Sequence, residues 1–380
     1  MAVQVNGTVA AGWEPVREAL AAFALTEETS PEAQLAVYHQ GRRVVDLWAG
    51  EDTAADTLTG VYSITKGAAH LVVALLVQDG VLDLERPVSQ YWPEFTGYGK
   101  ERLTLRQLVS HQSGLINTPE GFTLDEVADD ALVAARLAGQ KPYWEPGTGY
   151  GYHAFVIGAL TGEVVRRATG KTLQQVYEER IRAPYGLDLY IGLPAELEPR
   201  WKPVLPQVPT AAGLAALAGG PPPPALMETA FNWHTRPPMD LVAYANHPAV
   251  KSRGPASAGG VGTARGVAGM YAAAIGELAG RPALLKPETA AEFAKLHTPG
   301  DDLVTPEKDH FGLGFERQPQ VGPQAFGHCG AAGGLGFADP VTQVAYGYTR
   351  RRFGFPGGPS PENGPLTAAV LAAARAADQA

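Results

Sequence analysis

The sequence predicts an α/β fold in which both ends of the chain contribute strands to one lobe and a mainly helical segment lies between them. Two observations support this fold: β-type runs occupy residues 34–48 and return after residue 311, and most of the intervening segment has a helical period. Strands at both ends with helices between them indicate one α/β lobe with a helical insertion. We expect an α/β lobe over 1–78 and 250–380, and a helical lobe over 79–249 with a Pro-rich loop near 205–240.

The remaining elements are predicted from the spacing of apolar residues and from the Gly, Pro and Asp-Pro residues that form turns between them. A hairpin is predicted from strands over 34–39 and 43–48, and later strands over 311–316, 325–328, 335–339 and 343–349. Helices are predicted over 13–25, 103–109 with Thr104 as cap, 124–137, 155–169, 264–278 and 366–376. The Pro-, Ala- and Gly-rich stretch over 205–224 predicts an extended loop, not a packed element.

Composition excludes several classes of protein. The chain has 380 residues, 45% hydrophobic and 18% charged, as in ordinary soluble globular proteins. A net charge of −9 without a basic run argues against nucleic acids and anionic membranes as partners. No window is apolar enough to cross a bilayer, and residues 1–23 lack the basic start of a signal peptide. We therefore expect a cytoplasmic protein, and its one cysteine, Cys329, excludes an intramolecular disulfide.

Ser63 and Lys66 stand at the start of a long apolar run that stops at Asp79-Gly80, which is the pattern of a buried helix. Residues three apart share one face of a helix, so Lys66 projects beside Ser63. Burial moves a lysine pKa from about 10.4 toward about 7–8, where the amine can activate a hydroxyl. The same pair also fits an ordinary N-cap serine followed by a lysine that reaches solvent.

Two later stretches add candidate groups. The loop over 146–154 places Tyr150 and Tyr152 where either phenol can point into a cleft, although an aromatic residue there commonly covers a helix end. The Gly-rich stretch over 326–337 allows close approach to its backbone. A main-chain N–H just after His328, with that of Ser63, would then donate to an oxyanion. The alternative for His328 is a core histidine satisfied within the sheet.

Other patterns are less informative or argue against specific chemistries. The segment from Asn232 to Met239 forms either a wall of a substrate cleft or a plug for a small core. No serine lies in a Gly-x-Ser-x-Gly elbow. The nine histidines show no close metal-type spacing, and Cys329 has no second cysteine to join it. We therefore expect neither a metal nor an organic cofactor.

Taken together, the motifs resemble those of a known superfamily. Ser63-x-x-Lys66, Tyr152-His153-Ala154 and His328-Cys329-Gly330 have the order and approximate spacing of the signatures of class C β-lactamases and D-alanyl-D-alanine carboxypeptidases. The chain looks most like the family VIII carboxylesterases, and residues 104–115, 146–148 and 262–265 match family stretches too. The resemblance implies a β-lactamase/transpeptidase-like fold, with a mainly antiparallel sheet flanked by helices and an active site between sheet and helical lobe.

The resemblance also implies roles for particular residues. Ser63 resembles the acylated nucleophile, and Lys66 its base or proton partner. Tyr152 resembles the family tyrosine that is a general base in acylation and an acid for the leaving alcohol. His328 takes the place of the lysine in Lys-Thr-Gly. Gly330 follows it on the substrate-binding stretch, and the Ala331 and Ser63 amides would form the oxyanion hole.

Two departures from the superfamily pattern indicate the substrate. Ala154 stands where β-lactamases have an asparagine for the substrate amide, and His328 replaces a cation that grips a carboxylate. Both changes favour small neutral acyl or aryl esters, hydrolysed through an acyl-Ser63 intermediate. Hydrolysis of β-lactams, D-amino peptides or linear amides, acyl transfer, and a non-catalytic ligand-sensing relative remain alternatives. The first proton acceptor, Lys66 or Tyr152, and the oligomeric state are left open.

Overall fold

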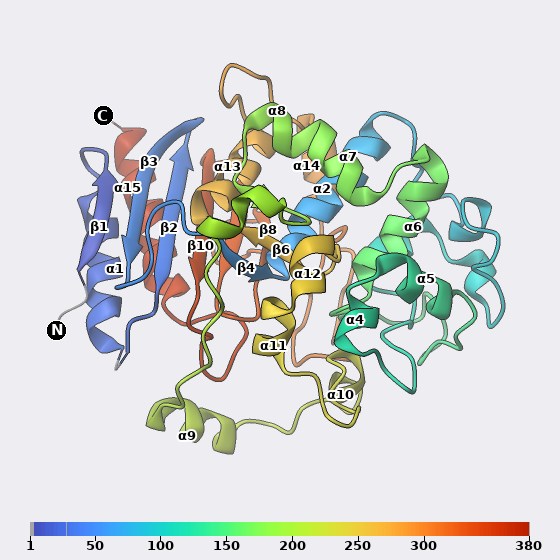
Figure 1. Cartoon of the computed structure of the whole chain (residues 1–380). Coiled ribbons are helices and arrows are strands. Elements are labelled where there is room, and N and C mark those ends of the chain that lie inside the picture. The colour runs from blue at the N-terminus through green and yellow to red at the C-terminus, as the bar shows by residue number, and fades with distance from the viewer. Residues whose placement is uncertain (1–3, 28, 380) are drawn as a thin grey trace.

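The computed structural model describes residues 4–27 and 29–379 of the chain. A seven-stranded antiparallel sheet stands at one side of the molecule, and helices fill the opposite side (Figure 1). Its strand order is β1-β3-β2-β10-β9-β8-β7. The strands are β1 (Val5–Val9), β2 (Ala33–His39), β3 (Arg42–Ala49), β7 (Glu316–Arg317), β8 (Phe326–Cys329), β9 (Leu335–Asp339) and β10 (Val344–Arg350).

Strands from the two ends of the chain meet in the middle of this sheet, where β10 pairs with β2 on one side and with β9 on the other. Helices α1 (Glu14–Thr26) and α15 (Asn363–Ala377) share an apolar core with one face of the sheet. Helix α13 (Ala264–Ile275) covers the other face, where Ala264 and Ala268 pack on Ala36. The predicted α/β arrangement from both termini is therefore confirmed.

A second, three-stranded sheet joins the large sheet to the helices. Its order is β4 (Thr59–Tyr62), β6 (Gly260–Gly262), β5 (Leu189–Tyr190). Helix α2 (Ile64–Gln78) follows β4, and every residue from Ile64 to Leu76 is buried. It contacts β8 on one side and the helices α6 and α7 on the other, so it connects the sheet with the helical part.

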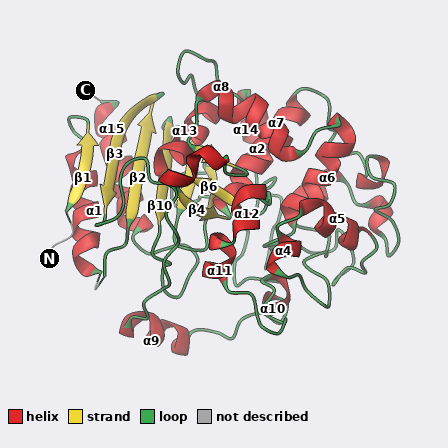
Figure 2. Cartoon of the chain, viewed as in Figure 1, coloured by secondary structure: helices red, strands yellow, loops and turns green. Residues whose placement is uncertain are grey.

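Helices and loops make up the side of the molecule away from the seven-stranded sheet (Figure 2). Among the residues described, no helix combines the length and apolarity that a membrane span requires. The remaining α-helices are α3 (Leu105–Val109), α4 (Leu124–Val127), α5 (Asp130–Ala138), α6 (Ile157–Thr169), α7 (Leu173–Tyr177), α8 (Ala183–Tyr185), α9 (Ala211–Gly219), α10 (Met227–Ala230), α11 (Leu241–Asn246), α12 (Pro248–Arg253) and α14 (Pro287–Ala294). Short 3₁₀ segments are Val88–Gln90, Lys100–Arg102 and Ala195–Arg200, and Glu178–Arg182 is a π-helix.

Three element predictions are wrong, each for a local reason. The strand predicted over 311–316 is a turn, because Gly314 adopts a φ of 76°; an isolated bridge joins Phe311 to Glu316, and only Glu316–Arg317 forms a strand. The helix predicted over 124–137 is split, since the Asp129 side chain accepts two N–H groups and starts α5. The predicted extended loop contains α9, which is exposed and stands away from the body in Figure 1. The lobe boundaries at 78/79 and 249/250 remain a prediction.

Candidate active site

Ser63 lies at the junction of β4 and α2, where the chain turns sharply. Tyr62 has a φ of 51°, a left-handed conformation that costs a non-glycine residue about 1–3 kcal/mol. Its ring packs edge-on to Phe353, with centroids 5.6 Å apart, and its hydroxyl donates to the Leu241 carbonyl at 2.9 Å. These contacts hold the turn. The Ser63 side chain makes no capping bond to α2, so the reading as an ordinary N-cap is wrong.

Lys66 is fully buried beside Ser63, so it does not reach solvent as the alternative reading required. Its Nζ lies 3.0 Å from Ser63 Oγ and donates to the carbonyl oxygens of Ala154 at 2.6 Å and Ser257 at 2.8 Å. Because an ammonium has three hydrogens, two carbonyls leave one direction, and that direction faces Ser63. A neutral amine in this position keeps both carbonyl bonds and presents its lone pair to the serine hydroxyl.

The charge state of Lys66 follows from what surrounds it. Burial lowers the pKa of Lys66 to about 7, and the Glu316 carboxylate only partly opposes that effect. The partners of the amine are carbonyls and a hydroxyl, which stabilise a cation less than a bonded carboxylate does. At neutral pH a substantial fraction of the molecules therefore carries an unprotonated Lys66, as the sequence predicted.

Tyr152, and not Tyr150, reaches the serine. The Tyr152 hydroxyl donates to Ser63 Oγ at 2.6 Å, and Lys66 Nζ lies 4.9 Å from the centroid of its ring. The Tyr150 hydroxyl instead donates to the carbonyl oxygen of Gly300 at 2.8 Å. Burial, with a smaller contribution from neighbouring negative charge, raises the pKa of Tyr152 well above 10. The phenol therefore keeps its proton at neutral pH and approaches Ser63 as a donor.

Two distant segments hold the Tyr152 loop in place. His111 Nδ1 accepts the N–H of His153 at 3.2 Å, and Ser113 Oγ lies 2.6 Å from His153 Nε2. On the other side, Asp302 Oδ1 accepts the N–H of Tyr152 at 3.2 Å. The stretch after α3 and the loop after α14 thus fix the position of the phenol.

His328, predicted in place of a substrate-gripping cation, is fully buried and does not line the cavity at Ser63. Its Nδ1 lies 2.8 Å from the Cys329 carbonyl oxygen and 3.2 Å from Glu316 Oε1, so Nδ1 carries the ring proton. Burial lowers the pKa of His328 to about 4, and the ring is neutral at pH 7. The reading as a core histidine describes it better, although its Nε2 has no partner among the described residues.

The main-chain N–H groups after His328 differ in availability. That of Cys329 donates to Glu316 Oε2 at 2.8 Å, and that of Gly330 to a carbonyl four residues further on. Within the described chain, the N–H groups of Ala331 and Ser63 make no hydrogen bond, and both residues line one cavity. These two amides are therefore available to an oxyanion. Gly330 cannot be a donor in this conformation.

The Ser63 hydroxyl faces a cavity of about 250 Å³. One wall is aromatic: Phe231 and Trp233 stack with centroids 4.9 Å apart, and the Phe231 ring lies 6.1 Å from that of Tyr152. Trp233 thus forms a wall of the cleft, as one of the two readings proposed. Among the described residues, no lysine or arginine lines this cavity. Its titratable lining side chains are those of Tyr152, Glu307, His310, Glu316 and Cys329.

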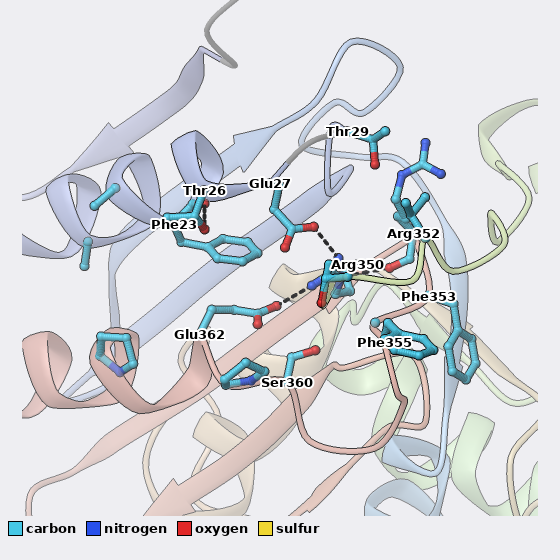
Figure 3. Close-up of a pocket in the computed structure, with 17 residues that line it drawn as sticks. Phe23, Thr26, Glu27, Thr29, Arg350, Arg352, Phe353, Phe355, Ser360 and Glu362 are labelled. Atoms are coloured by element: carbon cyan, nitrogen blue, oxygen red, sulfur yellow. Dashed lines mark hydrogen bonds and ion pairs between the residues drawn. The ribbon is translucent and has the colours of Figure 1, made fainter. Parts of the chain in front are cut away.

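Two larger cavities lie away from Ser63. One of about 970 Å³ is lined by residues of the 118–126 and 232–243 segments. The other, of about 510 Å³, lies between α1, the start of α15 and the segment after β10 (Figure 3). At its centre Arg350 lies between Glu27 and Glu362. Neither cavity contains the predicted catalytic residues.

A potential metal-binding group lies next to the cleft. Glu316, His328 and Cys329 have ligand-type atoms within 4.8 Å of one another, the one such group among the residues described. The Cys329 thiol donates to Glu316 Oε1 at 3.1 Å, and burial raises its pKa, so it stays protonated. A metal would have to displace that proton and break these bonds. The arrangement of Glu316, His328 and Cys329 is therefore that of a hydrogen-bonded cluster.

The fold and the Ser63 geometry define the class, and comparison with known proteins agrees. The Beta-lactamase family model matches residues 9–372, so the chain belongs to this family and is a serine hydrolase. The esterase/β-lactamase LipL from Mycobacterium tuberculosis is 32% identical over 336 residues, which cover 84% of this chain and 76% of LipL. The predicted superfamily is thereby confirmed.

Solved structures show the same relationship. EstA from Arthrobacter nitroguajacolicus Rue61a superposes with a TM-score of 0.87 at 40% identity, over 99% of each chain. The crystal structure of a family VIII carboxylesterase gives a TM-score of 0.83 at 33% identity, over 97% of this chain and 100% of that one. The predicted β-lactamase/transpeptidase-like fold is therefore confirmed.

Sequence reasoning missed three contributors to the site. Ser257 supplies a carbonyl to Lys66, and Glu316 and His310 lie on the cavity wall. A backbone carbonyl leaves no sequence signal. His310 directly precedes the strand predicted over 311–316, and Glu316 is its last residue. An acid and a histidine six residues apart carry no metal or triad pattern.

Proposed function

We propose that this protein is a carboxylesterase that hydrolyses small neutral acyl or aryl esters through an acyl intermediate on Ser63. One observation carries the proposal: Ser63 Oγ is within hydrogen-bond distance of both Lys66 Nζ and Tyr152 OH, at 3.0 and 2.6 Å. The two partners have different protonation states at neutral pH, one able to accept a proton and the other to donate one.

In acylation, neutral Lys66 takes the hydroxyl proton of Ser63 while Oγ attacks the ester carbonyl carbon. The new oxyanion accepts hydrogen bonds from the Ser63 and Ala331 amides, each typically worth about 3–4 kcal/mol in the transition state. As the carbon–alkoxide bond breaks, Tyr152 gives its proton to the leaving oxygen and regains the one held by Lys66. This assigns the first proton acceptance to Lys66.

The cavity supports small, uncharged substrates. At about 250 Å³ it lies below the range of pockets that hold drug-sized ligands. Without a lysine or arginine on its described lining and with His328 neutral, it offers no cation to a substrate carboxylate. The Phe231–Trp233 wall suits a flat apolar group. The name of LipL includes an esterase activity, and one of the similar solved structures is that of a family VIII carboxylesterase.

β-Lactam hydrolysis is the second candidate, because the name of LipL joins both activities. Side-by-side kinetics on a p-nitrophenyl ester and a chromogenic cephalosporin separate the two. We expect kcat/KM for the ester to exceed that for the cephalosporin by at least about tenfold, since a carboxylate finds no cation. A reversed ratio would make the β-lactam the better substrate class.

The assignment of Ser63 is tested by labelling and substitution. An alkyl phosphonate should add its mass to the wild-type protein at Ser63, and Ser63→Ala should lose ester turnover by on the order of 10⁴-fold or more. Ser89→Ala, at a half-buried serine that donates to the Glu101 carbonyl and does not line the cavity, is the control. Near-wild-type turnover by Ser63→Ala would show that another residue is the nucleophile.

A further inference from the structure

His310 and Glu316 form a carboxylate–imidazole pair on the wall of the catalytic cavity. His310 Nε2 lies 3.6 Å from Glu316 Oε1, an ion-pair distance. Glu316 is itself fixed, because it accepts the Cys329 N–H at 2.8 Å and the Cys329 thiol at 3.1 Å. Its side chain is 6% exposed, against 22% for His310. Both side chains line the cavity, and the imidazole is the more exposed member of the pair, while the carboxylate is held in place.

The second nitrogen of His310 is open. Among the described residues, no hydrogen-bond partner is found for His310 Nδ1, while Nε2 faces Glu316. The ring packs edge-on to Phe311, with centroids 4.5 Å apart. An imidazole held from one side by a carboxylate, with its other nitrogen free, has the orientation of a general base. Glu316 also raises the pKa of His310 against the effect of burial, so the ring is a stronger base than an isolated buried histidine.

The groups that act in acylation are poorly placed for the water that must follow. Lys66 is 0% exposed, and its three directions are taken by two carbonyls and Ser63. Once Ser63 Oγ is esterified, the Lys66 amine faces an ester oxygen, and there is no hydroxyl proton for it to accept. Tyr152 keeps its own proton, because its pKa lies well above 10. Among the described residues that line the cavity, His310 is the one histidine.

Resting on the function proposed above, we infer that His310, oriented by Glu316, is the general base that activates water for hydrolysis of the acyl-Ser63 ester. Nδ1 takes one proton from water as the water oxygen bonds to the acyl carbon. The tetrahedral oxyanion is held by the Ser63 and Ala331 amides. When it collapses, the bond from the acyl carbon to Ser63 Oγ breaks, and Oγ takes a proton from the Tyr152 hydroxyl, which faces it. His310 then releases its proton to solvent and Tyr152 takes one up, so the carboxylic acid leaves and both groups return to their starting state.

The test separates acylation from deacylation. His310→Gln is mixed with a p-nitrophenyl ester in a stopped-flow instrument, and the burst and the steady state are fitted separately, normalised to sites titrated with the phosphonate. General-base catalysis contributes about 10²–10⁴-fold, so we expect deacylation to slow by about 10²-fold or more. Acylation should stay within about threefold, and mass spectrometry should show acyl-Ser63 accumulating.

Two further measurements sharpen the result. In His310→Ala, added imidazole should restore at least about tenfold of the lost deacylation rate by replacing the missing base. His297→Gln is the matched control, because His297 lies near the same segment, bonded through its N–H to the Phe311 carbonyl, but does not line the cavity. It should behave as wild type.

The inference is overturned if deacylation in His310→Gln stays within threefold of wild type, or if acylation falls by the same factor as deacylation. It is also overturned if imidazole has no effect on His310→Ala. Failure of the phosphonate to label Ser63 in the wild type would instead overturn the proposed function, so the two failures are distinguishable.

Discussion

Lys66 and Arg350 are two buried cations with opposite electrostatic environments. Lys66 is 0% exposed and is bonded to two carbonyls and a hydroxyl. Arg350 is 5% exposed and bonded to two carboxylates, Glu362 at 2.7 Å and Glu27 at 2.9 Å (Figure 3). Burial lowers the pKa of Lys66 to about 7. Burial alone would also lower the pKa of Arg350, but the negative groups around it outweigh this effect, and its pKa is raised above the ordinary arginine value.

The difference teaches what makes a buried cation reactive. Carbonyl dipoles satisfy the hydrogen-bond geometry of Lys66 without compensating its charge, so the proton is easily lost. Two carboxylates compensate Arg350, so it stays charged and links α1 to α15. The first arrangement yields a base next to a nucleophile, and the second yields a tertiary cross-link. Of the two residues, only Lys66 lies next to the proposed nucleophile.

The largest expected effect is on catalysis. Lys66→Met should reduce kcat/KM for a neutral ester by on the order of 10³-fold, because the first proton acceptor is gone. Lys66→Arg should be about as inactive, since a guanidinium keeps the bonds to carbonyls but does not give up its proton. Initial-rate kinetics with a p-nitrophenyl ester measure both. Full activity of the arginine variant would show that charge, not basicity, is what Ser63 needs.

At the other cation the expected effect is on stability. Arg350→Met should lower the free energy of unfolding by about 3–5 kcal/mol, because it leaves Glu362 buried without its counter-charge. Urea unfolding followed by circular dichroism provides the measurement. Replacement of the exposed Arg102 by Met is the control and should cost less than about 1 kcal/mol. A loss of similar size in both variants would mean that the Arg350 ion pairs add nothing specific.

The pH dependence tests the lowered pKa of Lys66 directly. Protonated Lys66 is inactive, so kcat/KM should rise about tenfold per pH unit up to about pH 7 and level off above it. The pH–rate profile of the free enzyme reports this group. In Lys66→Met the same limb should disappear from the residual activity. A wild-type profile that keeps rising toward pH 10 would assign Lys66 an ordinary lysine pKa.

The smallest expected effect separates the two carboxylates at Arg350. The Glu27 side chain is 25% exposed and that of Glu362 is 2% exposed. Glu27→Gln should cost about 0.5–1 kcal/mol of unfolding free energy, as for a solvent-screened pair. Glu362→Gln should cost at least about twice as much, because both members of the Glu362–Arg350 pair are buried. Thermal unfolding of the two variants, compared at one pH, checks the order, and the reverse order would contradict it.

Much of the site was predictable because it is local. Ser63 and Lys66 are three residues apart in an apolar run, so helical geometry alone places them together. Strands such as Leu335–Asp339 matched their predicted bounds because alternation and Gly punctuation act within a few residues. The residues alone did not decide between Tyr150 and Tyr152, since both lie on the same irregular loop, and only the family resemblance favoured Tyr152. The decision required the contacts of Gly300 and Ser63, which are distant in sequence.

By itself, the sequence determined the helix that carries Ser63 and Lys66, the family to which the chain belongs, and strands at both ends of the chain. Tertiary structure alone decided that Lys66 faces two carbonyls, that His328 turns from the cavity and that His310 enters it. The physical reason is range. Helical and strand periods are set by neighbours in the chain, whereas desolvation and hydrogen-bond partners are set by segments that folding brings together.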